Sequence, residues 1–333
     1  MEKQKRILTG DRPTGKLHLG HYVGSLANRV ALQHEYDTFL IIADTQALTT
    51  NWDQPERLAA SIRQVTEDYM AIGIDPAIVT IFIQSMIPQL AELTMFYGNF
   101  ISVNVLRHNP TIKTEAEQHG YNDMNYGFLG YPVSQAADIT FCKADLVPVG
   151  QDQMPHIELT RKIARRFNEL YAPVLVVPEG LVGKVGRLVG LDGKAKMSKS
   201  LDNCIYLSDS AKEVAAQINK AVTDPERIRA TDLGHPEVCT VYLYHQTFNS
   251  DEAAEICENC QAGKIGCVAC KKRLTAKLNE LLEPMRERRI PYQNNPRLLD
   301  DILIAGTDHA REVAKETMRE VRDAMRISYF NKQ

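Results

Sequence analysis

The stretch that decides the fold is RILTGDRPTGKLHLGHYVG, residues 6–24. It begins with a short apolar run, Ile7 and Leu8, which leads into a loop rich in Gly and Pro and then to two histidines, His18 and His21. Residues three apart share one face if a helix begins here. Glycines allow close backbone approach, and a helix N-terminus favours an anion. The stretch therefore predicts the ligand-binding edge of an α/β sheet.

Four further runs have the apolar, β-branched character of buried parallel strands. Helical patterns separate these runs along the chain, and this alternation predicts a doubly wound, Rossmann-like parallel sheet that binds a nucleotide. The five predicted strands are Arg6–Thr9, Thr38–Ala43, Val79–Gln84, Leu146–Val149 and Val174–Val177.

Helix signals fill the intervals and dominate the last third of the chain. Asp53 followed by Pro55 predicts a helix start, and that helix runs to about Gly73. A second amphipathic helix spans Ile157 to Phe167. After about residue 205 the β-rich runs stop, and the remaining patterns, Ala211–Ala221, Lys272–Arg289 and Thr307–Tyr329, are helical. We expect a nucleotide-binding domain at 1–205, a smaller all-helical domain at 206–295, and C-terminal helices at 296–333, beginning after Asn295-Pro296, that pack back on the first domain.

Composition narrows the class of protein. The chain has 333 residues, 44% of them hydrophobic, which suits about two domains with a sizeable core. Its net charge of −3 gives no global basic field, so any RNA contact has to come from local patches. No run has the length of a signal peptide's apolar segment or a membrane span. We expect a cytoplasmic protein with no membrane partner.

A second motif is DGKAKMSKSLDN, residues 192–203. It places Lys194, Lys196 and Lys199 on a polar loop after the last predicted strand, with Ser198 and Ser200 between and beyond them. Such a loop is a candidate clamp for a polyphosphate, while alone it would read as a solvated loop. The two histidines alone would likewise suit a surface turn. Both motifs at opposite ends of one α/β domain favour a shared phosphate site.

These motifs give the chain a family resemblance. HLGH (18–21) is similar to the HIGH signature of class I aminoacyl-tRNA synthetases, and KMSKS (196–200) matches their second signature residue for residue. Three segments narrow the resemblance to the tryptophanyl-tRNA synthetases: GDRPTG (10–15), YPVSQAADI (131–139) and VPVGQDQMPHIELTRKIARRFN (147–168). AVTD (221–224) and the Cys-rich stretch also fit. The chain departs from many bacterial members at Arg12, where they have Gln, and from some relatives at Gln135, where they have Met.

The resemblance implies an activity, partners and site residues. It implies activation of L-tryptophan by ATP with Mg²⁺, transfer to tRNA(Trp), anticodon recognition by the helical domain, and a homodimer. The implied catalytic residues are His18, His21, Lys196 and Lys199. The implied ATP site comprises Arg12, Pro13, Thr14, Gly20, His21, Gly150, Gln151, Asp152, Leu188, Lys196, Met197, Ser198, Lys199 and Ser200. The implied tryptophan site comprises Leu8, Gln46, Tyr131, Gln135, Asp138 and Gln153.

The chemistry of the side chains agrees with this assignment. An indole N–H is a donor only, so its site needs an acceptor within an apolar wall. Tyr131, Gln135 and Asp138 are spaced four and three apart on a predicted helix and share a face, with Asp138 as the acceptor. The alternative interpretation pairs Asp138 with a nearby Lys or Arg. The VGQDQ segment (149–153) offers hydrogen bonds to ribose, adenine or amino acid, and its alternative role is a polar helix cap.

Four cysteines crowd between residues 257 and 270, and their spacing leaves the cofactor open. The CxxC pairs Cys257/Cys260 and Cys267/Cys270 are typical of a zinc site. The set Cys239, Cys260, Cys267 and Cys270 resembles the one that holds a [4Fe–4S] cluster in some tryptophanyl-tRNA synthetases. The remaining interpretation is four reduced thiols without metal.

Two other functions and one surface assignment also stay open at this point. A tyrosyl-tRNA synthetase shares both signatures, and a non-catalytic tryptophan-sensing paralogue would share the pocket. Within the helical region, the basic clusters 271–273 and 286–289 are candidate RNA contacts or a solvated helix face.

Overall fold

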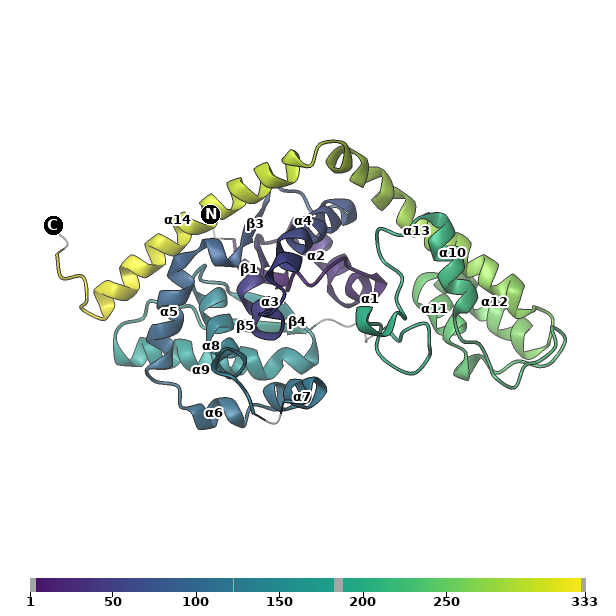
Figure 1. Cartoon of the computed structure of the whole chain (residues 1–333), viewed down its shortest axis with the longest axis horizontal. Coiled ribbons are helices and arrows are strands. Elements are labelled where there is room, and N and C mark those ends of the chain that lie inside the picture. The colour runs from purple at the N-terminus through teal and green to yellow at the C-terminus, as the bar shows by residue number, and fades with distance from the viewer. Residues whose placement is uncertain (1–3, 122, 183–187, 331–333) are drawn as a thin grey trace.

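The computed structural model describes residues 4–121, 123–182 and 188–330. At its centre lies a five-stranded parallel sheet in the order β3-β2-β1-β4-β5 (Figure 1). The register pairs Thr9 with Leu40 across β1 and β2 and Leu40 with Ile81 across β2 and β3. The strands are β1 Arg6–Asp11, β2 Asp37–Ile42, β3 Val79–Ile83, β4 Leu146–Val149 and β5 Glu179–Val182.

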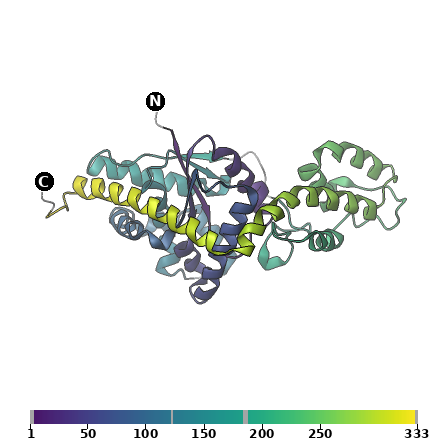
Figure 2. The same ribbon diagram turned by 90° about the horizontal axis from the view of Figure 1, so that it is seen from above.

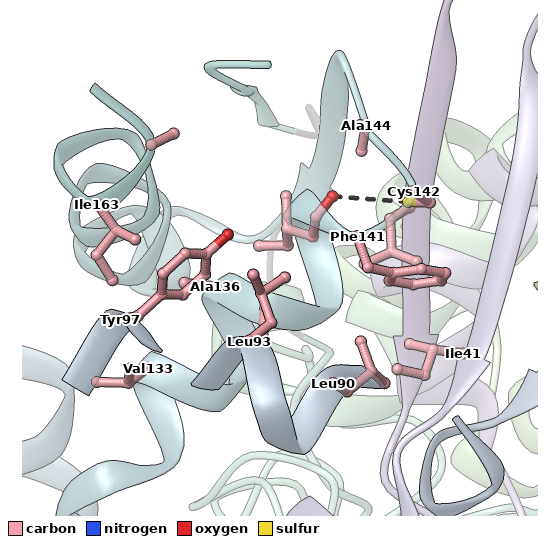
Figure 3. Close-up of a cluster of buried hydrophobic side chains, with 14 of the residues drawn as sticks. Ile41, Leu90, Leu93, Tyr97, Val133, Ala136, Phe141, Cys142, Ala144 and Ile163 are labelled. Atoms are coloured by element: carbon pink, nitrogen blue, oxygen red, sulfur yellow. Dashed lines mark hydrogen bonds between the residues drawn. The ribbon is translucent and has the colours of Figure 1, made fainter. Parts of the chain in front are cut away.

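Both faces of the sheet are buried, as the apolar runs predict. In β2, Phe39 and Ile41 belong to one hydrophobic cluster while Leu40 and Ile42 belong to the other, because successive strand residues point to opposite faces. The first cluster packs the sheet against helices that lie before and after β4 in the chain, the C-terminal helix included, and Figure 3 shows Ile41 beside Leu90 and Phe141 in this layer. The second cluster extends from the sheet into the helical half of the chain. This confirms a doubly wound sheet with a helical C-terminal region.

Nineteen helical elements surround and extend the sheet in the described part of the chain, and five of these are short 3₁₀ or π turns. Those before β4 are α1 Leu19–His21, η1 Tyr22–Leu26, α2 Ala27–Leu32, α3 Asp44–Asn51, α4 Pro55–Ile72, η2 Gln84–Met86, α5 Pro88–Gly98, α6 Val103–Arg107, α7 Pro110–His119 and α8 Tyr126–Thr140. Those after β4 are η3 Gln151–Gln153, α9 Met154–Leu170, η4 Lys199–Leu201, α10 Ala211–Lys220, η5 Pro236–Val238, α11 Thr240–Phe248, α12 Ser250–Gln261, α13 Cys267–Asn294 and α14 Arg297–Ala324.

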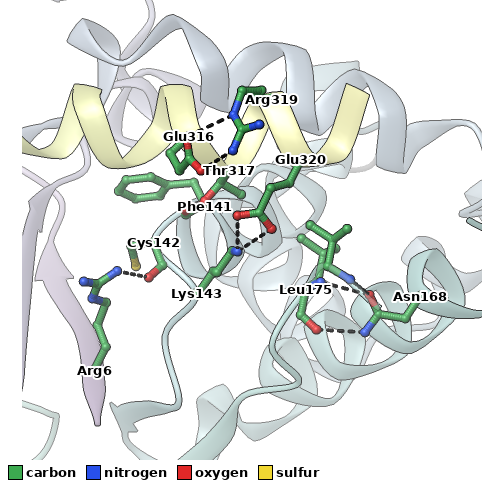
Figure 4. Close-up of polar contacts among 11 residues, drawn as sticks. Arg6, Phe141, Cys142, Lys143, Asn168, Leu175, Glu316, Thr317, Arg319 and Glu320 are labelled. Carbon is green, nitrogen blue, oxygen red and sulfur yellow. Dashed lines mark hydrogen bonds and ion pairs between the residues drawn. The ribbon is translucent and has the colours of Figure 1, made fainter. Parts of the chain in front are cut away.

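The predicted strand at Val174–Val177 is wrong. The side chain of Asn168 occupies the hydrogen-bonding groups of that run: its Oδ1 accepts from the N–H of Val174 at 3.1 Å and of Leu175 at 2.9 Å, and its Nδ2 donates to the Leu175 carbonyl at 2.8 Å (Figure 4). The run is therefore a partly buried connection, and the fifth strand begins only at Glu179.

Helix boundaries differ from the predictions at several ends. The helix expected from Asp53 begins at Pro55, with Gln54 as its N-cap, and it ends as predicted before Gly73, whose φ of +99° suits glycine. The helix expected from Lys272 begins five residues earlier, at Cys267. The last helix begins at Arg297, directly after the Asn295-Pro296 signal and before the pattern expected from Thr307, and it ends at Ala324 without reaching Tyr329.

The last helix, α14, follows the chain back from the helical half across the sheet (Figures 1 and 2). It contacts β3 so closely that a Cβ at Gly306 would lie 2.0 Å from the carbonyl oxygen of Ile81. Farther along, Thr317 Oγ1 donates to the Phe141 carbonyl at 2.6 Å, and Lys143 Nζ lies 2.6 Å from a Glu320 oxygen (Figure 4). None of the described helices is both long enough and apolar enough to cross a membrane.

Candidate active site

A cavity of about 340 Å³ opens where the carboxyl ends of β1, β2 and β4 meet, the position at which doubly wound sheets bind ligands. Side chains of α8 form one wall and residues of η1 and α2 another. Eight of the predicted site residues line this cavity: Leu8, Arg12, Gln46, Tyr131, Gln135, Asp138, Gly150 and Gln153.

Asp138 lies at the buried end of the cavity. It is 2% exposed, and its carboxylate accepts hydrogen bonds from Gln84 Nε2 at 2.9 and 2.8 Å and from Gln46 Nε2 at 2.7 Å. Both partners are neutral amides, so the alternative pairing with Lys or Arg is wrong. A carboxylate has about four acceptor sites, so one remains for a ligand donor beside these three bonds.

Gln84 is a partner of the candidate site residue Asp138 that the sequence analysis missed. It follows β3 at the same sheet edge, is 2% exposed, and also accepts from the backbone N–H of Gln46 at 3.1 Å. The signal for it was its place at the carboxyl end of a predicted strand, where a polar residue is unusual in an otherwise apolar run.

The pKa of the Asp138 carboxyl is raised to about 7, mainly because the group is buried. The hydrogen bond from Gln84 lowers this pKa, and the nearby charge of Asp44 raises it. A carboxyl so placed changes its protonation near neutral pH. In its ionised form it can only accept, which suits a ligand that only donates.

A second polar group lies on the α8 wall. The hydroxyl of Tyr131 donates to Glu115 Oε2 at 2.9 Å and lies 2.8 Å from His156 Nε2. Burial lowers the pKa of His156 to about 4, so this ring is neutral at physiological pH. Glu115 lines the cavity, and neither it nor His156 stood out in the sequence.

The two signature histidines pack on each other outside the cavity. Their ring centroids lie 3.8 Å apart, and the backbone N–H of His18 donates to Nδ1 of His21 at 3.2 Å. Burial lowers the pKa of His18 to about 3 and that of His21 to about 4. Both rings are therefore neutral near pH 7, and because Nδ1 of His21 accepts, its Nε2 carries the proton. Each ring has one N–H to offer a phosphate oxygen.

The lysine loop meets the histidine loop directly. Nζ of Lys199 donates to the Gly15 carbonyl at 2.8 Å, and Gly20 N–H donates to Sδ of the buried Met197 at 3.2 Å. A Cβ at Gly20 would lie 2.9 Å from the His18 ring, so the contact requires glycine. Burial lowers the pKa of Lys199, while Asp11 and Asp68 raise it. The structure thus brings the two signatures together.

The remaining predicted ATP residues lie between and beside these groups. Thr14 N–H closes a turn onto the Arg12 carbonyl at 2.8 Å, and the Leu188 carbonyl accepts from the Met197 N–H at 3.1 Å. Gly150 directly follows β4, and a Cβ at this position would lie 2.7 Å from Asp152 Oδ1. Ser200 lies in η4, but its side chain is not among those that the structure describes. Residues 183–187 also lie outside the described residues.

Four cysteine side chains gather in the helical half. Burial raises the pKa of Cys270 to about 12, and the charges of Cys239, Cys260 and Cys267 add to that increase. Cys257 is not among these neighbours and hydrogen-bonds with Tyr242 instead. No group of three or more His, Cys, Asp or Glu side chains in the described residues is arranged to hold a metal ion. The structure gives no zinc site from the two CxxC pairs.

The basic clusters of α13 are only partly turned toward the protein, since Lys272, Arg273 and Arg288 are exposed. Lys271 Nζ donates to two backbone carbonyls, those of Asn219 and Ala221, at 2.8 and 2.7 Å. Arg286 donates to the Asp209 carbonyl at 2.9 Å, and Arg289 is 4% exposed. The interpretation of Arg289 as an RNA contact is wrong, because its guanidinium is buried in an ion pair.

The geometry can bind an amino acid with a donating side chain at Asp138 and a polyphosphate at the junction of the two loops. Comparisons with known proteins agree. A family model for class I tRNA synthetases (W and Y) matches residues 1–283. The tryptophan–tRNA ligase of Streptococcus pneumoniae serotype 4 is 49% identical over 336 residues, 98% of each chain, and that of Clostridium longisporum is 50% identical over 333 residues, also 98% of each.

Solved structures agree as well. A tryptophanyl-tRNA synthetase from Campylobacter jejuni, in complex with ADP and tryptophan, superimposes with a TM-score of 0.86 at 30% identity and covers 96% of this chain and 99% of its own. Relatives at about 50% identity over almost the whole chain separate the tryptophan branch from the tyrosine branch that shares the family model. The chain belongs to the tryptophanyl-tRNA synthetase family of class I tRNA synthetases.

Proposed function

We propose that this chain activates L-tryptophan with ATP and transfers it to tRNA(Trp). The tryptophan carboxylate attacks the α-phosphate of ATP, forming tryptophanyl-adenylate while pyrophosphate leaves. The terminal ribose hydroxyl of the tRNA then attacks the acyl carbon and AMP leaves. No protein nucleophile takes part, so catalysis rests on positioning and on stabilising charge.

One observation carries this proposal: a buried carboxylate with one free acceptor site lies in a cavity that Arg12 also lines, and the Arg12 loop contacts Lys199 at Gly15. Tryptophan offers one indole N–H to Asp138. With the ring there, the amino acid's carboxylate extends toward the loop that carries Arg12 and the neighbouring histidines and lysines. The neutral His18 and His21 donate to phosphate oxygens, and Lys196 and Lys199 hold the leaving phosphates.

The ATP assignments depend on charge as well as position. Mg²⁺ binds phosphate oxygens together with water, and so it enters with ATP without a dedicated protein cage. Its role here is to neutralise the phosphates beside the two lysines. The residues assigned to ATP are otherwise those of the two loops and of the 150–153 segment.

The test is charging of total tRNA with labelled amino acids. We expect labelled tryptophan to be esterified and labelled tyrosine not to be. Charging with tyrosine would contradict the assignment in favour of a tyrosyl-tRNA synthetase, and tryptophan binding without charging would support the non-catalytic paralogue.

For the cysteines we propose a [4Fe–4S] cluster held by Cys239, Cys260, Cys267 and Cys270. Support comes from the resemblance of this set to the one that holds such a cluster in some tryptophanyl-tRNA synthetases, and from the proximity of the four thiols, while Cys257 bonds with Tyr242. A cluster spans more space than a single ion, so its ligands need not meet at one point. We expect brown protein with about four iron atoms per chain after anaerobic purification. Colourless protein with less than about a tenth of an equivalent of iron would contradict the cluster.

We also propose that the chain works in the cytoplasm as a homodimer and that its helical half binds the anticodon. Met95 of α5 and Val103 of α6 are 67% and 55% exposed and are candidate contacts between two copies. Light scattering should give twice the chain mass of 37.5 kDa. A monomer at micromolar concentration would contradict this assignment.

A further inference from the structure

Two consecutive residues of α4 hold the two ends of the loop that precedes the signature histidines. The hydroxyl of Tyr69 donates to Asp11 Oδ2 at 2.8 Å, at the end of β1. Oδ2 of Asp68 accepts from the backbone N–H of Leu17 at 2.7 Å. Asp68 is 1% exposed and Tyr69 is completely buried. The loop at residues 11–17 is therefore attached to one helix at both ends.

Asp68 is in turn held by α13. Its Oδ1 accepts a hydrogen bond from Nη2 of Arg289, and Nη1 of the same guanidinium lies 3.4 Å from Oε1 of Glu67. On the next turn of α4, the Ala71 carbonyl accepts from Nε of Arg288 at 2.6 Å. Since α13 begins at Cys267 in the helical half, these arginines connect that half to the helix that carries Asp68 (Figure 1).

The segment held by Asp68 lies between the two signatures. Beyond Leu17, the Leu17 carbonyl accepts from the N–H of Leu207 at 3.0 Å, and the N–H of Leu19 donates to the Ile205 carbonyl at 2.9 Å. Residues 205–207 directly follow the lysine loop. His18 is therefore fixed by α4 on one side and by the chain leaving the lysine loop on the other.

We propose that Asp68 and Arg289 are positioning residues for adenylate formation. The buried pair couples α13 to the Leu17 backbone and so sets His18 and His21 relative to Lys199. This inference rests on the proposed function. Neither residue touches the cavity that holds the amino acid. Because transfer of this kind depends on alignment, a shift of about 1 Å in the histidines costs up to about a hundredfold in rate.

The tryptophan end of the site is supported separately. Asp138 is held by Gln46 and Gln84, which follow β2 and β3, and within the described part of the chain these three residues make no hydrogen bond or ion pair with α4 or α13. Loss of the Asp68–Arg289 pair should therefore change the rate of adenylate formation while the KM for tryptophan stays the same. A merely structural role would affect both.

The experiment measures kcat and KM for tryptophan and ATP by tryptophan-dependent ATP–pyrophosphate exchange. The variants are Asp68→Asn, Arg289→Met, both together, and Arg289→Lys. Arg63→Ala is the matched control: Arg63 also joins α4 to another helix, through Asp300 of α14 at 3.0 Å, but it is exposed and bonds to nothing in the loop. Circular dichroism and thermal midpoints establish that each variant is folded.

We expect kcat to fall at least tenfold in Asp68→Asn and in Arg289→Met, with the KM for tryptophan within twofold of the unaltered chain. The double variant should be no worse than the poorer of the two, because one pair is broken in each. Arg289→Lys should lose less, since a lysine keeps the charge but cannot contact Glu67 and Asp68 together. Arg63→Ala should keep the full kcat.

Folded Asp68→Asn with an unchanged kcat would overturn the proposal, and so would equal losses in kcat and tryptophan affinity. If Asp68→Asn and Arg289→Met do not fold, Arg289→Lys decides: a full kcat there would also overturn it. An unaltered chain without tryptophan-dependent exchange would instead contradict the proposed function, and the positioning role with it. The two failures are thus told apart by the unaltered chain alone.

Discussion

Asp138 shows what residue-level chemistry can and cannot predict. The spacing of Tyr131, Gln135 and Asp138 places them on one face of a helix, and the structure puts all three at one cavity. Its partners Gln46 and Gln84 lie 92 and 54 residues away in sequence, so nothing local to the YPVSQAAD segment could identify them. The raised pKa of Asp138 follows from burial and from the surrounding charges and hydrogen bonds, so it could not be predicted from the sequence either.

Removing the acceptor should cost selectivity for tryptophan. In Asp138→Ala the indole N–H loses its charged acceptor, and Gln46 and Gln84 lose the same acceptor. The fall in kcat/KM for tryptophan should therefore correspond to about 2–4 kcal/mol of transition-state stabilisation. Exchange kinetics with tryptophan and tyrosine measure this. Unchanged kinetics would contradict the role of Asp138, and Arg63→Ala provides the folded control.

The raised pKa of Asp138 also makes a prediction about stability. The folded state holds a proton up to about pH 7 that the unfolded chain releases near its usual value of 3.8, so this group's contribution is full below about pH 4 and is lost as pH rises through 7. The loss is on the order of 2–4 kcal/mol. Urea unfolding of the unaltered chain and of Asp138→Asn between pH 4.5 and 8 isolates it. Parallel curves for the two proteins would contradict the raised pKa.

At the scale of elements, periodicity and caps identified most of the molecule. The helix ending at Gly73 and four of the five strands lie where the pattern places them, because burial on both faces gives parallel strands a continuous apolar run. The run at Val174–Val177 has that composition too, but Asn168 takes its backbone bonds. An apolar composition indicates that a run is buried. Whether the run forms a strand also depends on free backbone groups and a neighbouring strand, which composition does not identify.

The lysine loop is the element whose function is most open to direct test. Lys199 donates to the Gly15 carbonyl, and we expect ATP phosphates to replace that acceptor during the reaction. Because the contact strengthens as charge develops on the leaving pyrophosphate, Lys199→Ala should lower kcat for adenylate formation about a hundredfold and leave tryptophan binding nearly unchanged. Titration with tryptophan and single-turnover kinetics separate the two. Equal losses in both would contradict a role confined to the leaving group.

At the scale of the whole molecule, the two long helices α13 and α14 span from the helical half back across the sheet (Figures 1 and 2). The start of the C-terminal helix follows from the signal at Asn295-Pro296, but its return across the sheet and the contacts that hold it do not follow from sequence. Asp68 and Arg289 lie 221 residues apart and each reads as an ordinary helix charge. Long-range ion pairs of this kind are visible only once the fold is known.

The most direct test of the account is ATP–pyrophosphate exchange by the unaltered chain with tryptophan, with tyrosine and with no amino acid. A buried acceptor beside two joined phosphate loops predicts exchange that requires tryptophan and exceeds the rate with tyrosine by at least a hundredfold. Exchange that is equal with tyrosine, or absent with tryptophan while ATP still binds, would contradict it.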